Sequence, residues 1–334
     1  MSGPAPDAAR PRLSVVVPTH GDAAATARCF RALDAACASV ADCERILVDD
    51  ASGDGTAEAI VAAHGDVRVV RILEPQGFTA AANAGLAAAR GEIVWLLHAD
   101  TEVAPDAAGR LLGALDGCPW LGVAGAALVA PDGAARVSGG SVPGARTLLV
   151  LDAFVEALLG RLSGTRQLAS TDASAKPVEV DWVSGASLAL RRATLERTGL
   201  LDPAFRVHGQ DADLCLRARA LGWQVMLVPR ARVVHHEASA AAHGRLAAAE
   251  GRHVEPPWPD VVRLVVKHRG VATARRVRAA FVAGAALRVA LRRAALPFVA
   301  APRRAEWRRD TEAAVAALAG LRRLDLAGLT VEHV

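Results

Sequence analysis

The sequence has no hydrophobic run that could cross a membrane and no cysteine pattern of a disulfide-rich or zinc-binding protein. A spanning helix needs about 18 to 20 apolar residues, whereas the best candidate, 279–287, lies between Arg278 and Arg288. The five cysteines form no CxxC pair and are odd in number, so we expect buried thiols rather than a disulfide framework or structural zinc. The N-terminus lacks the apolar core of a signal peptide. These absences predict a soluble, cytoplasmic protein.

Neither sign of charge dominates the whole chain. Among 334 residues, 39 Lys and Arg face 35 Asp and Glu, and 52% of the residues are hydrophobic. A chain this apolar can bury enough surface to offset its ordering entropy, which excludes a disordered or collagen-like protein. The charge is unevenly distributed, because residues 259–334 hold 15 Lys and Arg against 6 Asp and Glu, and residues 1–258 hold 24 against 29. The basic character belongs to the C-terminal tail.

Short apolar runs alternate with alanine-rich stretches through the first 130 residues. This pattern is typical of a parallel sheet covered by helices on both faces. The expected elements are strands at 13–17, 45–48, 68–73, 92–97 and 182–190, helices at 26–40, 79–90, 151–162 and 191–198, and a short helix capped by Asp54 with Ile60 and Val61 inward. Residues 131–180 are rich in Gly, Ser and Pro and predict an irregular segment. After Pro256 we expect helices broken near Pro297 and Pro302.

Polar residues follow three of the expected strands. The segments 18–22, 49–56 and 98–101 each contain Asp, and ligands of a parallel sheet bind beyond the carboxyl ends of its strands. Each segment alone also suits an ordinary loop or helix cap. Three acidic clusters on one edge repel one another unless a cation or a donor-rich ligand is present. Together they predict a ligand site at this edge.

Two common nucleotide-binding motifs, the dinucleotide fingerprint and the P-loop, are incomplete or missing. Residues 53–58, Gly-Asp-Gly-Thr-Ala-Glu, begin like the dinucleotide fingerprint G-x-G-x-x-G, but Glu58 replaces the third glycine and Asp54 would repel a pyrophosphate. The P-loop pattern G-x-x-x-x-G-K-[ST] is absent. Hydride transfer and P-loop chemistry are therefore disfavoured.

Five motifs resemble, in order and spacing, those of the family 2 glycosyltransferases. The first strand runs into Pro-Thr, and 46–56 reads Ile-Leu-Val-Asp-Asp-Ala-Ser-Gly-Asp-Gly-Thr. Residues 77–85 resemble the Gly-Phe-x-x-Ala-x-Asn-x-Gly helix of the family, and 96–101, Leu-Leu-His-Ala-Asp-Thr, its metal-binding D-x-D region. Residues 185–192 with 209–215 resemble the acceptor-side Gly-Ala-x-Leu and Gly-Glu-Asp-x-Asp-Leu motifs.

This resemblance covers about residues 13–236 and implies a GT-A fold. That is an α/β fold with a Rossmann-like, mostly parallel sheet and helices on both faces, here followed by a helical C-terminal extension. The expected boundaries are a flexible N-terminus at 1–12, a transferase domain at 13–255 and a basic helical extension at 256–334. Within the domain, 13–130 would form the nucleotide half and 131–255 the acceptor half.

The resemblance also assigns residues to a nucleoside-diphosphate-sugar donor. The donor-binding candidates are Pro18 and Thr19 at the nucleoside, Asp49 at the base or ribose, and Asn83, His98 and Asp100. Asp100 and His235 would bind a divalent metal, Mn²⁺ or Mg²⁺, that bridges the diphosphate. An imidazole ligand suits Mn²⁺ better than Mg²⁺.

On the acceptor side, the resemblance implies an inverting displacement with Asp211 as general base. Gly185, Ala186, Gln210 and Asp213 would line the acceptor side. The alternative is that Asp211 and Asp213 only cap a helix and complement its dipole. Two departures from the family pattern are His98 in place of the first D-x-D carboxylate and Gln210 in place of Glu.

Three functions are open at this stage. The leading one is a metal-dependent inverting glycosyltransferase that acts on a hydroxyl of a glycan or lipid-linked cell-envelope acceptor. A catalytically silent nucleotide-sugar-binding module is the alternative. A nucleic-acid binder is disfavoured, because the tail lacks an aromatic stacking motif.

The basic tail resembles the C-terminal extension of rhamnosyltransferase-like members of the family. Basic amphipathic helices bind anionic lipid surfaces, so the tail could place the enzyme peripherally at the inner face of the cell membrane. The alternative is a pair of packing helices with a solvated arginine face.

Overall fold

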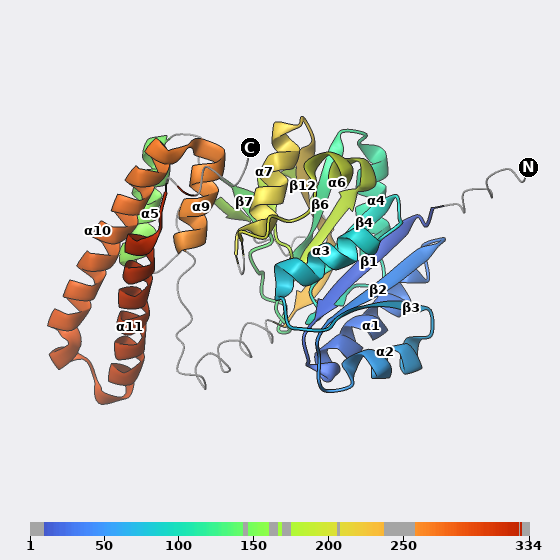
Figure 1. Cartoon of the computed structure of the whole chain (residues 1–334), viewed down its shortest axis with the longest axis horizontal. Coiled ribbons are helices and arrows are strands. Elements are labelled where there is room, and N and C mark those ends of the chain that lie inside the picture. The colour runs from blue at the N-terminus through green and yellow to red at the C-terminus, as the bar shows by residue number, and fades with distance from the viewer. Residues whose placement is uncertain are drawn as a thin grey trace, which may run out of the picture. The chain divides into compact units, whose positions relative to one another are not determined.

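The structure, a computed structural model, describes residues 10–142, 146–159, 166–168, 175–205, 208–236, 258–326 and 328. The chain divides into two compact units (Figure 1). The sheet unit comprises residues 1–140 and 167–238, and the helical unit comprises residues 141–166 and 239–334. This division differs from the expected boundary after residue 255, because 141–166 groups with the C-terminal helices. The expected flexible N-terminus lies largely outside the described residues.

Strands and helices alternate through the first part of the sheet unit, as expected. In chain order they are β1 (Leu13–Thr19), α1 (Ala23–Cys37), β2 (Cys43–Asp50), α2 (Thr56–His64), β3 (Val67–Ile72), α3 (Phe78–Ala88), β4 (Ile93–Leu97), β5 (Thr101–Val103), α4 (Ala107–Gly117) and β6 (Leu121–Val129). The later elements are β7 (Gly139–Ser141), β8 (Arg166–Leu168), β9 (Val178–Glu179), β10 (Trp182–Val183), β11 (Ser187–Arg191), α6 (Arg192–Thr198), α7 (Gln210–Ala220) and β12 (Gln224–His235).

The main sheet is mixed and mostly parallel, with the order β3-β2-β1-β4-β11-β6-β12-β5. Strand β1 pairs in parallel with β2 and β4, and β12 pairs in parallel with β6. Strand β11 runs antiparallel to both β4 and β6, and β5 and β9 run antiparallel to β12. A second, three-stranded sheet has the order β10-β7-β8. The expected α/β class with a mostly parallel sheet is confirmed.

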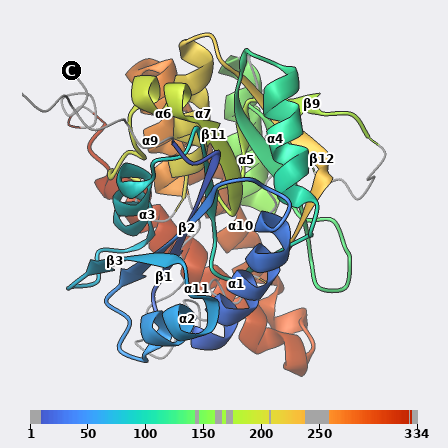
Figure 2. The same ribbon diagram turned by 90° about the vertical axis from the view of Figure 1, so that its right-hand side faces the viewer.

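Apolar side chains cover both faces of the main sheet. Val15 and Val17 of β1 belong to the core that α1, α2 and α4 cover, whereas Val16 faces the core under α3, α6 and α7. Successive side chains of a strand point to opposite faces, so a strand buried on both faces needs the continuous valine run of β1. Figure 2 shows α3 and the pair α1 and α2 on opposite sides of this sheet.

The strand expected at 182–190 is interrupted. A turn at residues 184–186 separates β10 from β11, and the Ser187 N–H donates to the Ser184 carbonyl at 3.2 Å. The two halves join different sheets, since β10 pairs with β7 and β11 with β4 and β6. An unbroken apolar pattern did not reveal this turn, which enters the site described below.

Three smaller expectations are corrected. Helix α1 begins at Ala23 rather than at Thr26, because the Asp22 carboxylate accepts the Ala25 N–H at 3.0 Å. Val61 is 40% exposed and does not face inward with Ile60, since adjacent helical residues point about 100° apart. A disulfide joins Cys37 to Cys43, whose Cα atoms lie 5.9 Å apart, so these two are not thiols.

The helical unit contains α5 (Arg146–Leu159), α9 (Trp258–Arg269), α10 (Val271–Ala295), the 3₁₀ turn η1 (Leu296–Phe298) and α11 (Ala301–Arg323). Trp258 stacks on Phe281 with ring centroids 5.6 Å apart, and both are buried. Gly284 lets α10 approach α5, because an added Cβ would overlap the Phe154 carbonyl oxygen. Within the described residues, none of the helices is both long and apolar enough to cross a membrane.

Candidate active site

The loops that follow β1, β2 and β4 meet at the carboxyl edge of the main sheet. Asp50 connects the end of β2 to the loop that follows β3, because its carboxylate accepts the N–H groups of Gln76 and Gly77 at 2.8 Å each. These bonds hold the loop that opens α3. Sequence reasoning did not single out Asp50, although it stands beside Asp49 in the same motif.

A turn of four residues brings His98 and Asp100 to the end of β4. The backbone N–H and the hydroxyl of Thr101 both bond to the His98 carbonyl, at 3.3 and 2.7 Å. The carbonyl of Asp100 accepts the His236 N–H at 3.0 Å. This bond brings the end of β12, and with it His235, beside the turn.

His98, Asp100 and His235 form a cluster of possible metal ligands. One donor atom from each lies within 4.8 Å of the other two. The Asp100 Oδ1 lies 3.3 Å from the His235 Nε2 and 3.9 Å from the His98 Nδ1. Ligand atoms about 2.1 Å from one ion are separated by such distances, so the three residues fit a divalent cation. Two imidazoles and one carboxylate suit Mn²⁺ better than Mg²⁺.

The protonation of His98 fits the same role. Burial, assisted by the neighbouring His235 and opposed by Asp100, lowers its pKa to about 4. The imidazole is therefore neutral at pH 7, and a neutral imidazole has the free lone pair that a metal ligand needs. The Phe78 ring packs edge-on against His98, with centroids 4.8 Å apart, and fixes the orientation of the imidazole.

Asp211 occupies the first turn of α7 and faces the turn that interrupts the expected strand. Its carboxylate accepts the Gly185 N–H and the Ala212 N–H, each at 2.8 Å. Burial raises its pKa, against the effect of these two N–H donors. A half-buried carboxylate with a raised pKa is suited to accept a proton.

The turn at 184–186 connects the carboxylate to the metal-ligand cluster. On one side Gly185 donates to Asp211, and on the other the Ala186 carbonyl accepts the His98 N–H at 3.1 Å. The structure thus brings Asp211, Gly185, Ala186 and the three clustered residues together. These motifs are about a hundred residues apart in the sequence. They lie close together in the fold because β11 is inserted antiparallel next to β4.

Several other predicted donor residues use their polar atoms within the protein. Pro18 is buried in β1, and the buried Thr19 hydroxyl bonds to the Gly21 carbonyl at 2.9 Å. Asp49 accepts the Ser52 N–H at 2.9 Å, and its second oxygen lies 3.5 Å from the Arg71 guanidinium. These contacts shape the loops after β1 and β2.

Asn83 fastens α3 to the segment before α7. Its amide nitrogen donates to the Leu201 carbonyl at 2.8 Å, and its amide oxygen accepts the Leu201 N–H at 2.9 Å. Both polar ends of this side chain are therefore bonded to one backbone position.

The remaining two acceptor-side candidates lie in α7. Gln210 is buried at the first position of the helix. Asp213 is fully buried and accepts from Arg217 at 2.8 Å, while the same arginine donates to the Leu200 carbonyl at 2.8 Å. This pair anchors α7 to the preceding loop.

The comparisons with known proteins agree with the motifs and the fold. Residues 14–138 match the model of the family described as Glycosyl transferase family 2. This match confirms the resemblance drawn from the motifs over these residues.

Two solved structures share the fold. GalNAc-T7 with UDP, GalNAc and Mn²⁺ has a TM-score of 0.53 and 20% identity, covering 78% of this chain and 48% of that chain. The mannosyltransferase PcManGT from Pyrobaculum calidifontis, in complex with GDP-Man and Mn²⁺, has a TM-score of 0.52 and 19% identity, covering 98% and 89%. The expected GT-A fold is thereby confirmed.

Curated relatives are matched over part of their length. The N-acetylglucosaminyl-diphospho-decaprenol L-rhamnosyltransferase of Mycobacterium tuberculosis is 28% identical over 209 residues, which are 58% of this chain and 66% of the relative. An uncharacterized protein of Sinorhizobium fredii is 34% identical over 184 residues, which are 53% of this chain and 19% of that protein.

Proposed function

We propose that this chain is a metal-dependent, inverting glycosyltransferase that uses a nucleoside-diphosphate-sugar donor. The observation that carries the proposal is the turn at 184–186, which hydrogen-bonds both to Asp211 and to the loop of the His98–Asp100–His235 cluster. A group able to take a proton and a group able to hold a cation are thus fixed to one backbone segment.

Asp211 is the proposed general base. It would take the proton of the acceptor hydroxyl as the acceptor oxygen bonds to the anomeric carbon and the bond from that carbon to the diphosphate oxygen breaks. The Gly185 and Ala212 N–H groups hold the carboxylate in one orientation during this transfer. We propose that Asp213 and Asn83 position α7 and α3 rather than contact the substrates.

His98, Asp100 and His235 would hold the divalent ion, with Mn²⁺ favoured by the two imidazoles. A bound ion would stabilise the negative charge that develops on the diphosphate leaving group. Two neighbours of the same fold carry Mn²⁺ with UDP or GDP-Man, which supports this choice of cofactor and donor class.

The proposed acceptor is a hydroxyl of a glycan or of a lipid-linked cell-envelope precursor. Support comes from the name of the Mycobacterium tuberculosis relative, an L-rhamnosyltransferase of N-acetylglucosaminyl-diphospho-decaprenol. By the same argument, L-rhamnose is the first sugar to test as the donor group.

The proposal is tested by calorimetric titration of the protein with UDP, dTDP and GDP, each with and without Mn²⁺. We expect one nucleotide to bind in the presence of Mn²⁺ and Asp100→Ala to weaken it at least tenfold. Asp116→Ala is the matched control, because this exposed carboxylate pairs with Arg12 away from the cluster. Absence of binding by all three nucleotides would overturn the proposed donor site.

A further inference from the structure

The helical unit ends in a hairpin with exposed apolar side chains. We call residues 287–311, which comprise the end of α10, η1 and the first half of α11, the hairpin tip. Phe298 is 90% exposed and Leu291 is 55% exposed. Leu287, one helical turn before Leu291, is 42% exposed. Single exposed apolar residues are ordinary, but a group of them at the end of a hairpin marks an interaction surface.

The rest of the helical unit already buries its apolar helix faces. Val277 and Phe281 of α10 lie in one core with Leu321 of α11. These helices therefore cannot lie flat on a membrane through their apolar faces without unpacking this core. A contact that leaves the unit folded has to use side chains that the core does not, such as those of the hairpin tip.

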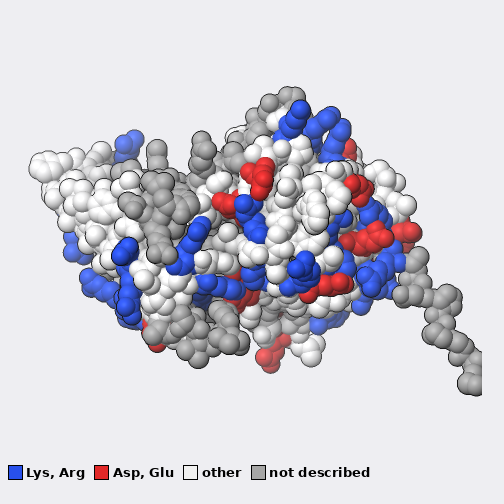
Figure 3. Space-filling view, turned by 90° about the horizontal axis from the view of Figure 1, so that it is seen from above, with Lys and Arg blue, Asp and Glu red and all other residues white. Residues whose placement is uncertain are grey.

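The hairpin tip is also rich in arginine. The hairpin tip contains seven arginines and two acidic residues in the sequence: Arg288, Arg292, Arg293, Arg303, Arg304, Arg308 and Arg309, with Glu306 and Asp310. Asp310 pairs with Arg292 at 2.9 Å and lies 4.0 Å from Arg288. Lys and Arg side chains also predominate on the face of the helical unit that Figure 3 shows. The surface around Phe298 is thus suited to an anionic partner.

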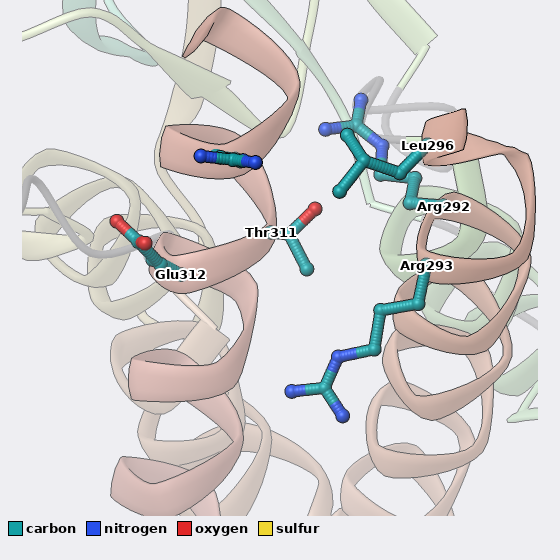
Figure 4. A pocket seen from close by; sticks show the side chains of 6 residues that line it. Arg292, Arg293, Leu296, Thr311 and Glu312 are labelled. Carbon is teal, nitrogen blue, oxygen red and sulfur yellow. The ribbon is translucent and has the colours of Figure 1, made fainter. Parts of the chain in front are cut away.

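Three of these arginines line a hollow between α10 and α11. The cavity measures about 180 Å³ and is lined by Arg292, Arg293, Leu296, Arg308, Thr311 and Glu312 (Figure 4). Figure 4 shows Arg293 of α10 reaching toward the side of α11 that carries Thr311. Arg292 is engaged by Asp310 and lies 5.3 Å from the Trp307 ring centroid.

Arg293 and Arg308 are available to a ligand. Both are exposed, and in the part of the chain that the structure describes neither forms an ion pair. Guanidinium groups on two helices can bind phosphate oxygens by paired N–H donors. The hollow therefore combines two arginines that have no ion pair among the described residues with an apolar wall, Leu296, and one carboxylate, Glu312.

We propose that the hairpin tip is a peripheral membrane-binding site for anionic phospholipids. Phe298 and Leu291 enter the boundary between headgroups and acyl chains, and Arg293 and Arg308 bind lipid phosphates. A bilayer presents an apolar layer directly beneath a layer of phosphates, which matches apolar side chains ringed by arginines. This inference does not depend on the proposed sugar transfer, because vesicle binding requires neither donor nor acceptor.

The test is sedimentation of the full chain with vesicles of phosphatidylcholine alone and with 30% phosphatidylglycerol. We expect binding to the anionic vesicles that weakens with added NaCl. Phe298→Ser should weaken vesicle binding about tenfold, because the variant no longer transfers a large apolar side chain from water into the bilayer. The double variant Arg293→Gln/Arg308→Gln should weaken it about 25-fold, since each basic residue near an anionic surface contributes about fivefold.

Matched controls come from the sheet unit. Trp120→Ser removes another aromatic side chain that is 70% exposed, and Arg31→Gln/Arg197→Gln removes two other exposed arginines. Both controls should bind the vesicles within twofold of the unmodified chain. Equal binding to neutral and anionic vesicles, or unchanged binding by both tip variants, would overturn the proposal. A dimer that Phe298→Ser converts to a monomer, with no effect on vesicle binding, would also overturn it and assign the tip to self-association.

Discussion

At the scale of single residues, two opposing effects act on the pKa of Asp211. Burial raises its pKa, while the N–H groups of Gly185 and Ala212 stabilise the charged form. The first effect brings the carboxyl group nearer to the pKa that favours general-base catalysis at neutral pH. The second keeps it deprotonated there, which the reaction requires.

The expected consequence is a rate that falls in acid. Because protonated Asp211 cannot accept a proton, kcat/KM should decrease as the pH drops through its raised pKa, above the value near pH 4 at which exposed Asp titrates. Asp211→Asn should lower kcat by about 10² to 10⁴ and leave the affinity for the nucleoside diphosphate within twofold. Rates of nucleoside diphosphate release between pH 4 and 9 measure both effects.

Two results would remove Asp211 from the role of base. One is a variant that transfers sugar at the unmodified rate, and the other is a rate independent of pH over this range. Asp106→Asn is a suitable control, because this exposed carboxylate lies at the N-terminus of α4, where it pairs with Arg110.

The residue types of the candidate site were predictable from the sequence, but their hydrogen-bond partners were not. The strand ends indicated Asp100 as a residue of the ligand-binding edge, and the family resemblance indicated His235 and Asp211. No pattern in the sequence indicated that Asn83 bonds to Leu201, a hundred residues later, at both ends of its amide. The hydrogen-bond partner of such a side chain depends on which loop the fold brings next to it.

At the scale of elements, small residues decide how closely helices approach the sheet. In α3, an added Cβ at Gly85 would overlap the Val16 side chain and lie 2.7 Å from the Val48 Cγ2. In α4, an added Cβ at Gly113 would have no atom within 4 Å. The two glycines therefore respond oppositely to the same substitution.

Gly85→Ala should lower the free energy of unfolding by about 1 to 3 kcal/mol, since overpacking outweighs the helix propensity of alanine. Gly113→Ala should raise it by about 0.5 to 1 kcal/mol, because only the propensity changes. Urea unfolding followed by circular dichroism measures both. A Gly85→Ala variant as stable as Gly113→Ala would contradict the close approach of α3 to β1.

Strand positions were predicted within a few residues, whereas interruptions were not. The runs of β-branched residues located β1 to β4, because strands buried on both faces require them. The apolar pattern across 182–190 gave no sign of the turn at 184–186, which arises because β10 and β11 pair in different sheets.

At the scale of the whole molecule, two units with separate cores make up the chain. The helical core of Phe281, Val277 and Leu321 shares no buried residue with the two cores of the main sheet. Sequence spacing could not assign α5 to this unit, because the helix lies within the irregular stretch 131–180. Its packing partner α10 follows more than a hundred residues later.

Separate cores should give separate unfolding transitions. Gly284→Ala pushes α10 away from α5, since the new Cβ would overlap the Phe154 carbonyl oxygen and lie 3.0 Å from the Ala157 Cβ. We expect scanning calorimetry to show two transitions, with Gly284→Ala lowering the midpoint of one and Gly85→Ala that of the other. A single transition that both variants shift equally would show that the units unfold together.

Strand β11 fixes the distance between two groups of hydrogen bonds in the sheet unit. Just before the start of β11, Gly185 bonds to Asp211 and Ala186 bonds to the His98 loop. At the end of β11, Arg191 donates to the Leu121 carbonyl at 2.8 Å, and Arg192 donates to the Ala89 carbonyl at 2.7 Å. The strand is only five residues long, and Arg191 is the last of them. One inserted residue would turn the later side chains of the strand to the opposite face, so we expect an insertion here to be far more disruptive than one in the exposed turn at 131–135.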